Sequence, residues 1–272
     1  MNTPRKTSSE IRAFKRTVLA HFQSHGRDLP WRKTRDPYRI LVSEFMLQQT
    51  QVDRVIPKYR SFLKAFPNVS KLARAPLGDV LLAWQGLGYN RRAHHLHEAS
   101  KEILKRYQKR VPKRIAELET LPGVGPYTAR AVATFAYGEP IVCIETNIRS
   151  AVLFHFFKEE ERVSDKEILP ILEAALVVKD PSTWLHALMD YGAYIKRTYG
   201  NQNTKSAHYA KQPAFRGSKR EARGYILRLL LEKPRTRRHL LRDIQSVHTE
   251  DALRDLLKEG LVTQNGRTFA LP

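Results

Sequence analysis

The segment from Ile40 to Leu47 constrains the fold of this chain more than any other part of the sequence. Six of its eight residues are apolar, and only Ser43 and Glu44 interrupt the run. A helix that is apolar on more than one side has to be enclosed by other elements. We therefore expect residues 38–54 to form a central buried helix, with Glu44 inside the protein.

The rest of the first 200 residues predicts an all-α fold around that helix. Apolar residues recur at helical spacing in short segments, brief Pro- or Gly-containing turns separate them, and strand-like alternation is nearly absent. An extended stretch is expected at 27–32, where a proline restricts the preceding residue. The further helices are expected at 11–24, 57–65, 68–74, 77–84, 91–107, 113–120, 127–137, 147–157, 165–178 and 183–196.

The two ends of the chain have a different character. Residues 1–10 are polar and are expected to form a disordered tail, and the polar residues 197–218 resemble a linker. Near the C-terminus, Asn265-Gly266 lies between two short apolar segments, which is a strong hairpin signal. Helices expected at 219–232, 235–243 and 249–259 precede that hairpin, so residues 216–272 are predicted to form a winged-helix-like domain.

The charge of the chain indicates a nucleic-acid partner. Its 48 Lys and Arg residues against 27 Asp and Glu give a net charge of +21, which suits phosphate backbones. No apolar run is long enough to cross a membrane. The single cysteine, Cys143, excludes an internal disulfide and a multi-cysteine metal site, and it fits a reducing cytoplasm.

Leu121-Pro122-Gly123-Val124-Gly125 lies between two expected helices. Glycines permit a tight hairpin with outward-facing amides, and the start of a helix binds phosphate well. The sequence alone leaves open whether this is a DNA-gripping hairpin or an ordinary connection between helices.

Two acidic residues are candidates for chemistry. A carboxylate at Glu44 would lie in apolar surroundings, which favour the neutral form that a general acid needs. Glu145 precedes a helix that is expected to begin near Asn147. Ordinary structural readings remain open, with Glu44 paired to a buried arginine and Glu145 stabilising a helix start.

The segment Val42-Ser43-Glu44-Phe45-Met46-Leu47-Gln48-Gln49-Thr50-Gln51-Val52 resembles the signature helix of MutY-type adenine DNA glycosylases, in the helix-hairpin-helix glycosylase superfamily. The resemblance extends over roughly residues 11–196. It also rests on further motifs in the family's order, at Arg27–Arg32, Gly86–Tyr89, Leu121–Thr128 and Met189–Ala193.

The resemblance implies a two-lobed fold and base excision from duplex DNA. Residues 11–28 with 142–215 would form a terminal helical lobe, and residues 29–141 a six-helix barrel lobe that includes the hairpin. Such enzymes flip a base out of the helix and cut its N-glycosidic bond. Glu44 would protonate the adenine ring, and Glu145 would stabilise positive charge on the sugar.

The resemblance also assigns roles to further residues. Tyr127 and Asn147 match positions around the catalytic centre. Because bifunctional relatives carry a Schiff-base lysine where Tyr127 stands, the chain is expected to be monofunctional. Gln49 and Tyr89 match residues that wedge into the base stack, and the hairpin residues Gly123, Val124 and Gly125 would contact DNA. Positions lining the base pocket fall on Arg27, Trp31, Leu47 and Asp190.

Three departures from the family pattern stand out. Glu145 replaces the family aspartate. The positions of the four iron–sulfur ligands fall on Lys196, Asn203, Ser206 and Gln212, so no 4Fe-4S cluster is expected. The family's usual C-terminal domain, which senses 8-oxoguanine, is replaced by the winged-helix-like segment.

The sequence thus predicts a monofunctional glycosylase that removes adenine mispaired with 8-oxoguanine or guanine. Alternatives are a mismatch glycosylase for thymine, uracil or a damaged base, and a non-catalytic lesion-binding protein. The expected partner is mispaired or damaged double-stranded DNA, bound by a monomer in the cytoplasm at the nucleoid. No metal and no cofactor are expected, with a monovalent cation at the hairpin as the one alternative.

Overall fold

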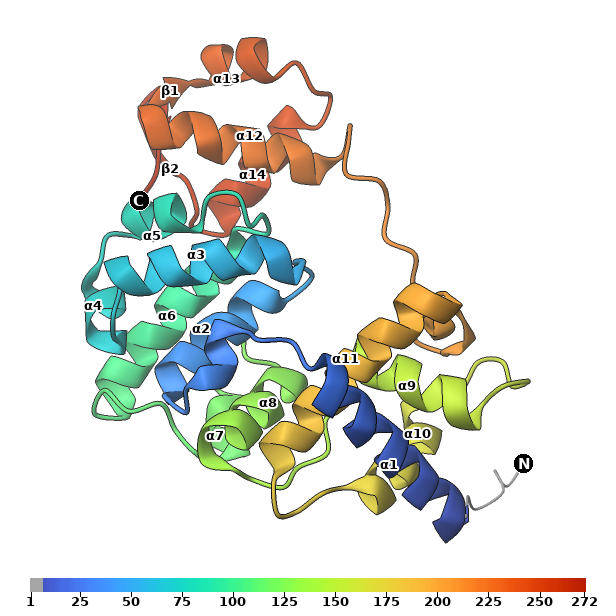
Figure 1. The fold of residues 1–272 in the computed structure, drawn as a ribbon. Coiled ribbons are helices and arrows are strands. Elements are labelled where there is room, and N and C mark those ends of the chain that lie inside the picture. Colours follow the sequence, from blue (N-terminus) through green and yellow to red (C-terminus); the bar gives the residue numbers. More distant parts are fainter. Residues whose placement is uncertain (1–6) are drawn as a thin grey trace. The chain divides into compact units, whose positions relative to one another are not determined.

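The computed structural model describes residues 7–272, and most of them are helical (Figure 1). This confirms the all-α fold class. The chain divides into two compact units. The first comprises the described residues up to Ile40 with 113–115 and 125–211, and the second comprises residues 41–112, 116–124 and 212–272. The lobe limits that the resemblance implied stay predictions.

In the first unit, the long helix α11 (Pro181–Tyr199) packs against α9 (Thr146–Phe156) and α1 (Ser8–His25), as Figure 1 shows. Aromatic rings fill this interface, because the Phe14 ring meets those of Phe156 and Trp184 edge to face at centroid distances of 5.2 and 6.3 Å. The remaining elements of this unit are η1 (Pro30–Lys33), α8 (Pro126–Tyr137), α10 (Asp165–Ala175) and η2 (Gln202–Lys205).

The second unit is built on α2 (Pro37–Leu47), which begins in the first. Every side chain from Ile40 to Met46 is at most 5% exposed, so the prediction of a central buried helix is confirmed. The helices that follow α2 in sequence are α3 (Val52–Ala65), α4 (Val69–Arg74), α5 (Leu77–Trp84), α6 (Arg91–Arg106) and α7 (Ile115–Leu118).

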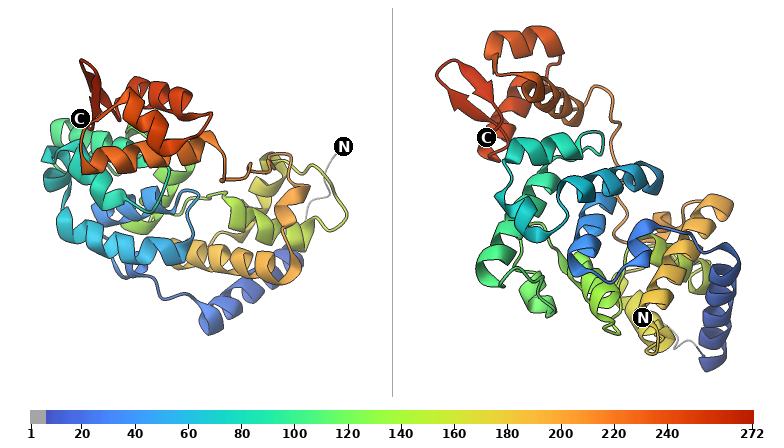
Figure 2. Two further views of the ribbon diagram at one scale, coloured as in Figure 1. Left: turned by 90° about the horizontal axis from the view of Figure 1, so that it is seen from above. Right: turned by 60° about the vertical axis from the view of Figure 1, so that its left-hand side comes forward.

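The C-terminal part of the second unit combines three helices with a small antiparallel sheet, coloured orange to red in Figure 2. The strand order is β1-β3-β2, and Gln264 pairs with Phe269 in the β2–β3 hairpin. Gly266 has a φ of +59° in its turn, as the Asn-Gly signal predicted. The elements are α12 (Lys219–Glu232), β1 (Arg235–Thr236), α13 (Arg237–Ile244), α14 (Thr249–Lys258), β2 (Thr263–Asn265) and β3 (Thr268–Ala270).

The predicted single helix over 38–54 is wrong. Helix α2 ends at Leu47, a turn follows in which Gln49 has a φ of +54°, and α3 begins at Val52. The carbonyl oxygens of Phe45, Met46 and Gln48 accept hydrogen bonds from the guanidinium of Arg92. Arg92, 44 to 47 positions away in sequence, therefore supplies donors that the backbone amides of a further helical turn would otherwise supply.

Three other expectations need correction. Residues 1–6 lie outside the described residues, but Ser8–Glu10 of the predicted tail are helical, because Thr7 and Glu10 form a capping box. Pro30 starts the short helix η1 within the predicted extended stretch. The predicted linker contains η2, in which Asn203 is only 5% exposed. Among the described residues, no helix has the length and apolar character to span a membrane.

Candidate active site

Glu44 lies in the middle of α2 and is only 5% exposed. Its neighbours along the helix, Ser43 and Phe45, are 1% and 0% exposed. The structure therefore places the Glu44 side chain away from solvent, as the sequence predicted. Leu47, a predicted pocket residue one turn further on, is half-buried at the end of the same helix.

Gln49 and Tyr89 occupy two neighbouring turns of the second unit. Each has a backbone in the left-handed region, with φ values of +54° and +48°. Such a conformation costs a non-glycine residue roughly 1–3 kcal/mol and is often found at functional sites. Both side chains are exposed, Tyr89 by 36%.

Arg92 joins these two turns. Its guanidinium donates to the carbonyls of Phe45 and Met46 at 2.9 Å, to the Thr50 hydroxyl at 2.9 Å and to the Gly88 carbonyl at 3.0 Å. Burial lowers the pKa of Arg92 to about 10, so it stays protonated at neutral pH. No sequence pattern singled out Arg92, although it lies three residues after the Gly86–Tyr89 motif.

Replacing Arg92 with glutamine should lower the free energy of unfolding by about 3 kcal/mol, because it strands several buried carbonyls without a donor. Urea unfolding would measure this change. The matched control is Arg91→Gln at the exposed neighbouring position, which should stay within about 0.5 kcal/mol of wild type. Equal stability of the two variants would contradict the role given to Arg92.

The hairpin that the sequence predicted lies between α7 and α8. Gly123 has a φ of +75°, and a Cβ there would lie 2.6 Å from the Cβ of His95, so only glycine fits. Val124 is buried and donates its amide to the Leu121 carbonyl at 3.1 Å. Gly125 is exposed and caps α8 without a side chain.

The hairpin leaves donors available. Within the described part of the chain, the amides of Gly123 and Gly125 form no hydrogen bond. Tyr127 is half-buried at the second position of α8. Free amides at the start of a helix are suited to an anion such as a DNA phosphate.

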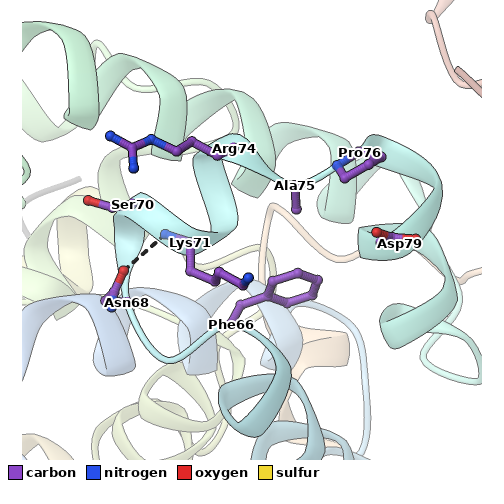
Figure 3. A pocket seen from close by; sticks show the side chains of 8 residues that line it. All are labelled: Phe66, Asn68, Ser70, Lys71, Arg74, Ala75, Pro76 and Asp79. Carbon is purple, nitrogen blue, oxygen red and sulfur yellow. Dashed lines mark hydrogen bonds between the residues drawn. The ribbon is translucent and has the colours of Figure 1, made fainter.

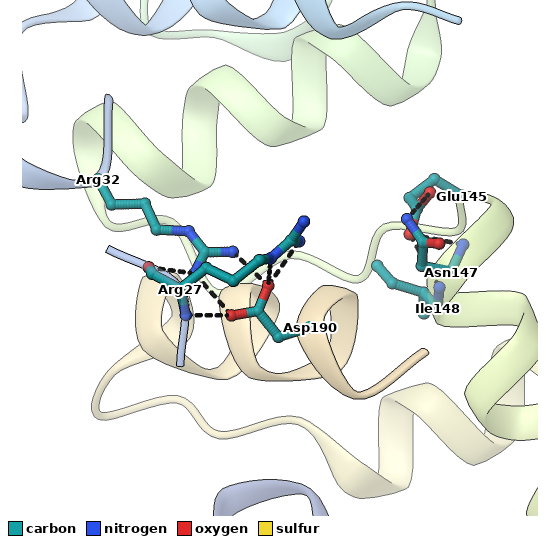
Figure 4. A network of polar contacts seen from close by, with 6 residues as sticks. All are labelled: Arg27, Arg32, Glu145, Asn147, Ile148 and Asp190. Carbon is teal, nitrogen blue, oxygen red and sulfur yellow. Dashed lines mark hydrogen bonds and ion pairs between the residues drawn. The ribbon is translucent and has the colours of Figure 1, made fainter. Parts of the chain in front are cut away.

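Glu145 is the N-cap of α9 in the first unit. Its Oε1 accepts hydrogen bonds from the amides of Asn147 and Ile148, both at 2.8 Å, and its Oε2 accepts from Nδ2 of Asn147 at 3.2 Å (Figure 4). Burial raises the pKa of Glu145, and these hydrogen bonds act against that shift. The carboxylate is thus fixed in place, with Asn147 as its principal partner.

A second polar network, drawn in the same close-up, surrounds Asp190 on α11 (Figure 4). This carboxylate accepts from the amide and Nε of Arg27 at 2.9 and 2.6 Å, and from both Nη atoms of Arg32 at 2.8 Å. Burial opposes ionisation, but the hydrogen bonds from Arg32 and Arg27 outweigh it and lower the pKa of Asp190. Trp31, between the two arginines in sequence, is 7% exposed.

Asp190→Asn should lower the free energy of unfolding by about 3 kcal/mol, because it leaves two arginines without their shared carboxylate. A depressed carboxyl pKa stabilises the fold above the ordinary pKa of about 3.9 and loses that effect as the pH falls. Wild type and variant should therefore differ at pH 7 and converge in strong acid, as unfolding curves would show. Asp28→Asn, at an exposed ion pair with Lys33, is the control and should change little; an equal loss there would contradict this account.

The four positions implied for iron–sulfur ligands do not fit a cluster, which thiolates hold. Lys196 and Gln212 are exposed, and Asn203 and Ser206 carry an amide and a hydroxyl. Asn203 instead donates to the Thr146 carbonyl at 3.1 Å and to the Ser150 hydroxyl at 2.7 Å, which ties η2 to the start of α9.

The neighbouring Lys205 ties η2 to the other end of the same helix, where it donates to the Phe157 and Lys158 carbonyls at 3.2 and 2.8 Å. Among the described residues, no group of three or more His, Cys, Asp or Glu side chains is arranged to hold a metal ion.

A surface pocket of about 540 Å³ lies elsewhere in the second unit, around the start of α4 (Figure 3). Lys71 and Arg74 give it a basic side, and none of the predicted site residues lines it. The Asn68 side chain in its wall accepts from the Lys71 amide and caps α4, so it has a structural task.

Comparison with known proteins identifies the family. Residues 42–174 match the family model described as HhH-GPD superfamily base excision DNA repair protein. An adenine DNA glycosylase of Mycobacterium tuberculosis is 36% identical over 94% of this chain and 92% of its own length. The chain belongs to the MutY-type adenine DNA glycosylases of this superfamily. A second adenine DNA glycosylase, from Mycolicibacterium smegmatis, is also 36% identical and covers 93% of this chain and 94% of its own length.

Solved structures agree with this placement. A thermostable thymine-DNA glycosylase superposes with a TM-score of 0.63 at 26% identity and covers 72% of this chain and 92% of its own. A trapped endonuclease III–DNA complex, at a TM-score of 0.60 and 20% identity over 70% of this chain and 88% of its own, shares the fold. A MutY-type chain therefore retains the helix-hairpin-helix fold with only one cysteine.

Proposed function

We propose that this chain is a monofunctional DNA glycosylase that removes mispaired adenine from duplex DNA by hydrolysing the N-glycosidic bond. The observation that carries the proposal is the buried Glu44 within the family's signature helix, in a chain whose relatives over nearly its full length are adenine DNA glycosylases. DNA as the substrate also fits the net charge of +21.

In the proposed mechanism, Glu44 is the general acid. Adenine leaves readily only after its ring is protonated, and a carboxyl group is a side chain that can supply that proton. The buried position of Glu44 supports this role, because water does not compete for the proton.

Glu145 and Asn147 are proposed to stabilise the positive charge that develops on the sugar. The hydrogen bonds to both carboxyl oxygens hold the Glu145 side chain in one position before the reaction begins. Tyr127, which cannot form a Schiff base, leaves water as the nucleophile, so the product is an abasic site without strand cleavage.

We assign DNA binding to the hairpin at residues 121–125 and to the two turns that contain Gln49 and Tyr89. The amides of Gly123 and Gly125 are proposed to bind a phosphate, with Val124 holding the turn in place. Gln49 and Tyr89 are proposed to enter the base stack, and the backbone supports of Arg92 would keep them rigid. Arg27, Trp31, Leu47 and Asp190 remain residues proposed to contact the flipped base.

A duplex panel tests this function. Labelled duplexes with adenine opposite 8-oxoguanine, guanine or cytosine are incubated with excess protein and then treated with alkali to cut abasic sites. We expect cleavage after alkali only, and fastest opposite 8-oxoguanine or guanine. No abasic product under these single-turnover conditions would rule the function out.

Thymine or uracil opposite guanine is the second candidate substrate. The structural similarity to a thymine-DNA glycosylase favours keeping it in the panel. The Gln48–Gln51 run, shared with the adenine enzymes in the resemblance, argues against it. Release of thymine or uracil but not adenine would replace the leading proposal.

Shortening Glu145 to aspartate should lower the rate of adenine release by about 10–100-fold. One methylene retracts the carboxylate by about 1.5 Å, and misplacement by about 1 Å can cost about 100-fold. Single-turnover rates of wild type and variant would measure the change, with thermal unfolding to show that the helix cap survives. A faster variant would mean that glutamate attenuates the enzyme.

We propose action as a monomer on mispaired duplex DNA, in the cytoplasm at the nucleoid. No cofactor is assigned a step in the reaction. The C-terminal helices and sheet are proposed to act as a winged-helix-like domain.

A further inference from the structure

The phenol of Tyr89 is held by two side chains, one from the predicted linker and one from α12. Nη1 of Arg220, on α12, donates to its oxygen at 2.7 Å, and Nε2 of Gln212 donates to the same oxygen. The Gln212 amide also donates to Oε1 of Gln49 at 3.2 Å. These four residues, here called the Tyr89 cluster, all belong to the second unit.

The Tyr89 cluster rests on a rigid support. Both Gln49 and Tyr89 have positive φ values, and Arg92 fixes the backbone of both turns. The Arg92 guanidinium also lies 5.4 Å from the centre of the Tyr89 ring, while that of Arg220 lies 5.9 Å from it. Arg220 and Gln212 therefore have a fixed position beside the two turns that contain Gln49 and Tyr89.

Arg220 differs from the other basic residues at the start of α12. Lys219 forms an ion pair with Asp255 of α14 at 2.7 Å, and Arg223 forms one with Glu259, directly after α14, at 2.6 Å. Within the described residues, Arg220 contacts the Tyr89 phenol, the carbonyls of Pro213 and Ala214 and two aromatic rings, but no carboxylate. Its positive charge is thus not paired with any carboxylate in the part of the chain that the structure describes.

A fixed guanidinium with an uncompensated charge suits an acceptor-rich partner. Arginine most often recognises guanine through its O6 and N7 acceptors. In 8-oxoguanine N7 carries a hydrogen, and the acceptors on that edge are O6 and the carbonyl oxygen at C8. Cytosine or thymine opposite the excised adenine does not present such a pair of acceptors on one base edge. Since Gln49 and Tyr89 are proposed to enter the base stack, the donors of Arg220 and Gln212 would lie beside the base pair that is opened.

We propose that Arg220 and Gln212 donate hydrogen bonds to the purine opposite the excised adenine, so that the C-terminal helices set the opposing-base preference. This inference rests on the proposed function for the identity of the excised base. The proposed contacts give α12 a role in specificity, because a contact to phosphate alone would stabilise every duplex equally.

Binding measurements test the inference without base release. Fluorescence anisotropy would give Kd values for duplexes in which a tetrahydrofuran abasic analogue stands opposite 8-oxoguanine, guanine, cytosine or thymine. We expect wild type to prefer the purines. Arg220→Gln should reduce that preference about 10-fold or more, and Gln212→Ala should reduce it in the same direction.

Arg228→Gln is the matched control, since Arg228 lies two turns later on α12 and stacks over Tyr225 at 4.4 Å. It should leave the preference unchanged. Uniform weakening of all four duplexes by Arg220→Gln, with a smaller salt dependence, would overturn the inference in favour of a phosphate contact. Tighter binding by that variant would overturn it in favour of an inhibitory cover over Tyr89.

Failure of the proposed function would look different. A wild-type protein that releases no adenine but binds with an Arg220-dependent purine preference would disprove the glycosylase activity alone. An active glycosylase whose preference is the same in Arg220→Gln and Gln212→Ala would disprove the inference alone.

Discussion

Glu44→Gln should reduce the single-turnover rate of adenine release by about 100- to 10,000-fold, the range typical of removing a general acid. Glutamine has nearly the shape of glutamic acid but cannot transfer a proton to the adenine ring. Because the side chain is buried in α2, its replacement should leave the two turns that contain Gln49 and Tyr89 in place. Binding of an abasic-analogue duplex should therefore change less than threefold, roughly 0.7 kcal/mol.

Glu119→Gln is the control for this experiment, because it removes the same charge from an exposed position in the second unit. It should be as active as wild type. If Glu44→Gln retained the wild-type rate, Glu44 would have a structural task and the proposed mechanism would be wrong.

Gly192→Ala should lower the free energy of unfolding by more than about 4 kcal/mol, or prevent folding. A Cβ at this position of α11 would lie 1.8 Å from the carbonyl oxygen of Asn147 and 2.4 Å from its carbon. These are backbone atoms at the start of α9 and cannot rotate away, so the two helices would have to separate. Thermal and urea unfolding would measure the loss.

The same variant should lose activity beyond its loss of stability, because Asn147 and Glu145 share that start of α9. Gly224→Ala is the matched control, since nothing lies within 4 Å of a Cβ at that helical glycine. It should be neutral or stabilise the protein by up to about 1 kcal/mol. Equal behaviour of the two variants would contradict the close approach of α11 and α9.

Local patterns predicted the parts of the fold that depend on local contacts. The apolar run around Glu44 predicted a buried helix, and the position of Glu145 before a helical pattern predicted the acid at a helix start that the structure shows. Asn265-Gly266 likewise predicted the C-terminal hairpin. In each case the physical cause lies within a few residues of the feature.

Contacts between distant residues explain what the sequence did not predict. Helix α2 stops at Leu47 because Arg92, far along the chain, takes the carbonyls that a further turn would use. The predicted linker contains an ordered turn because Asn203 bonds to Thr146 and Ser150. Arg32 was not singled out, since its partner Asp190 lies 158 positions away.

The most direct test of the central claim is to identify the base that wild-type protein releases. Excess protein is incubated with a duplex carrying a single adenine opposite 8-oxoguanine, and the free bases are separated by chromatography while abasic sites are counted in the same sample. We predict free adenine in a one-to-one ratio with abasic sites, from the wild type and not from Glu44→Gln. Intact duplex with no free base would contradict the assignment of this chain as an adenine glycosylase.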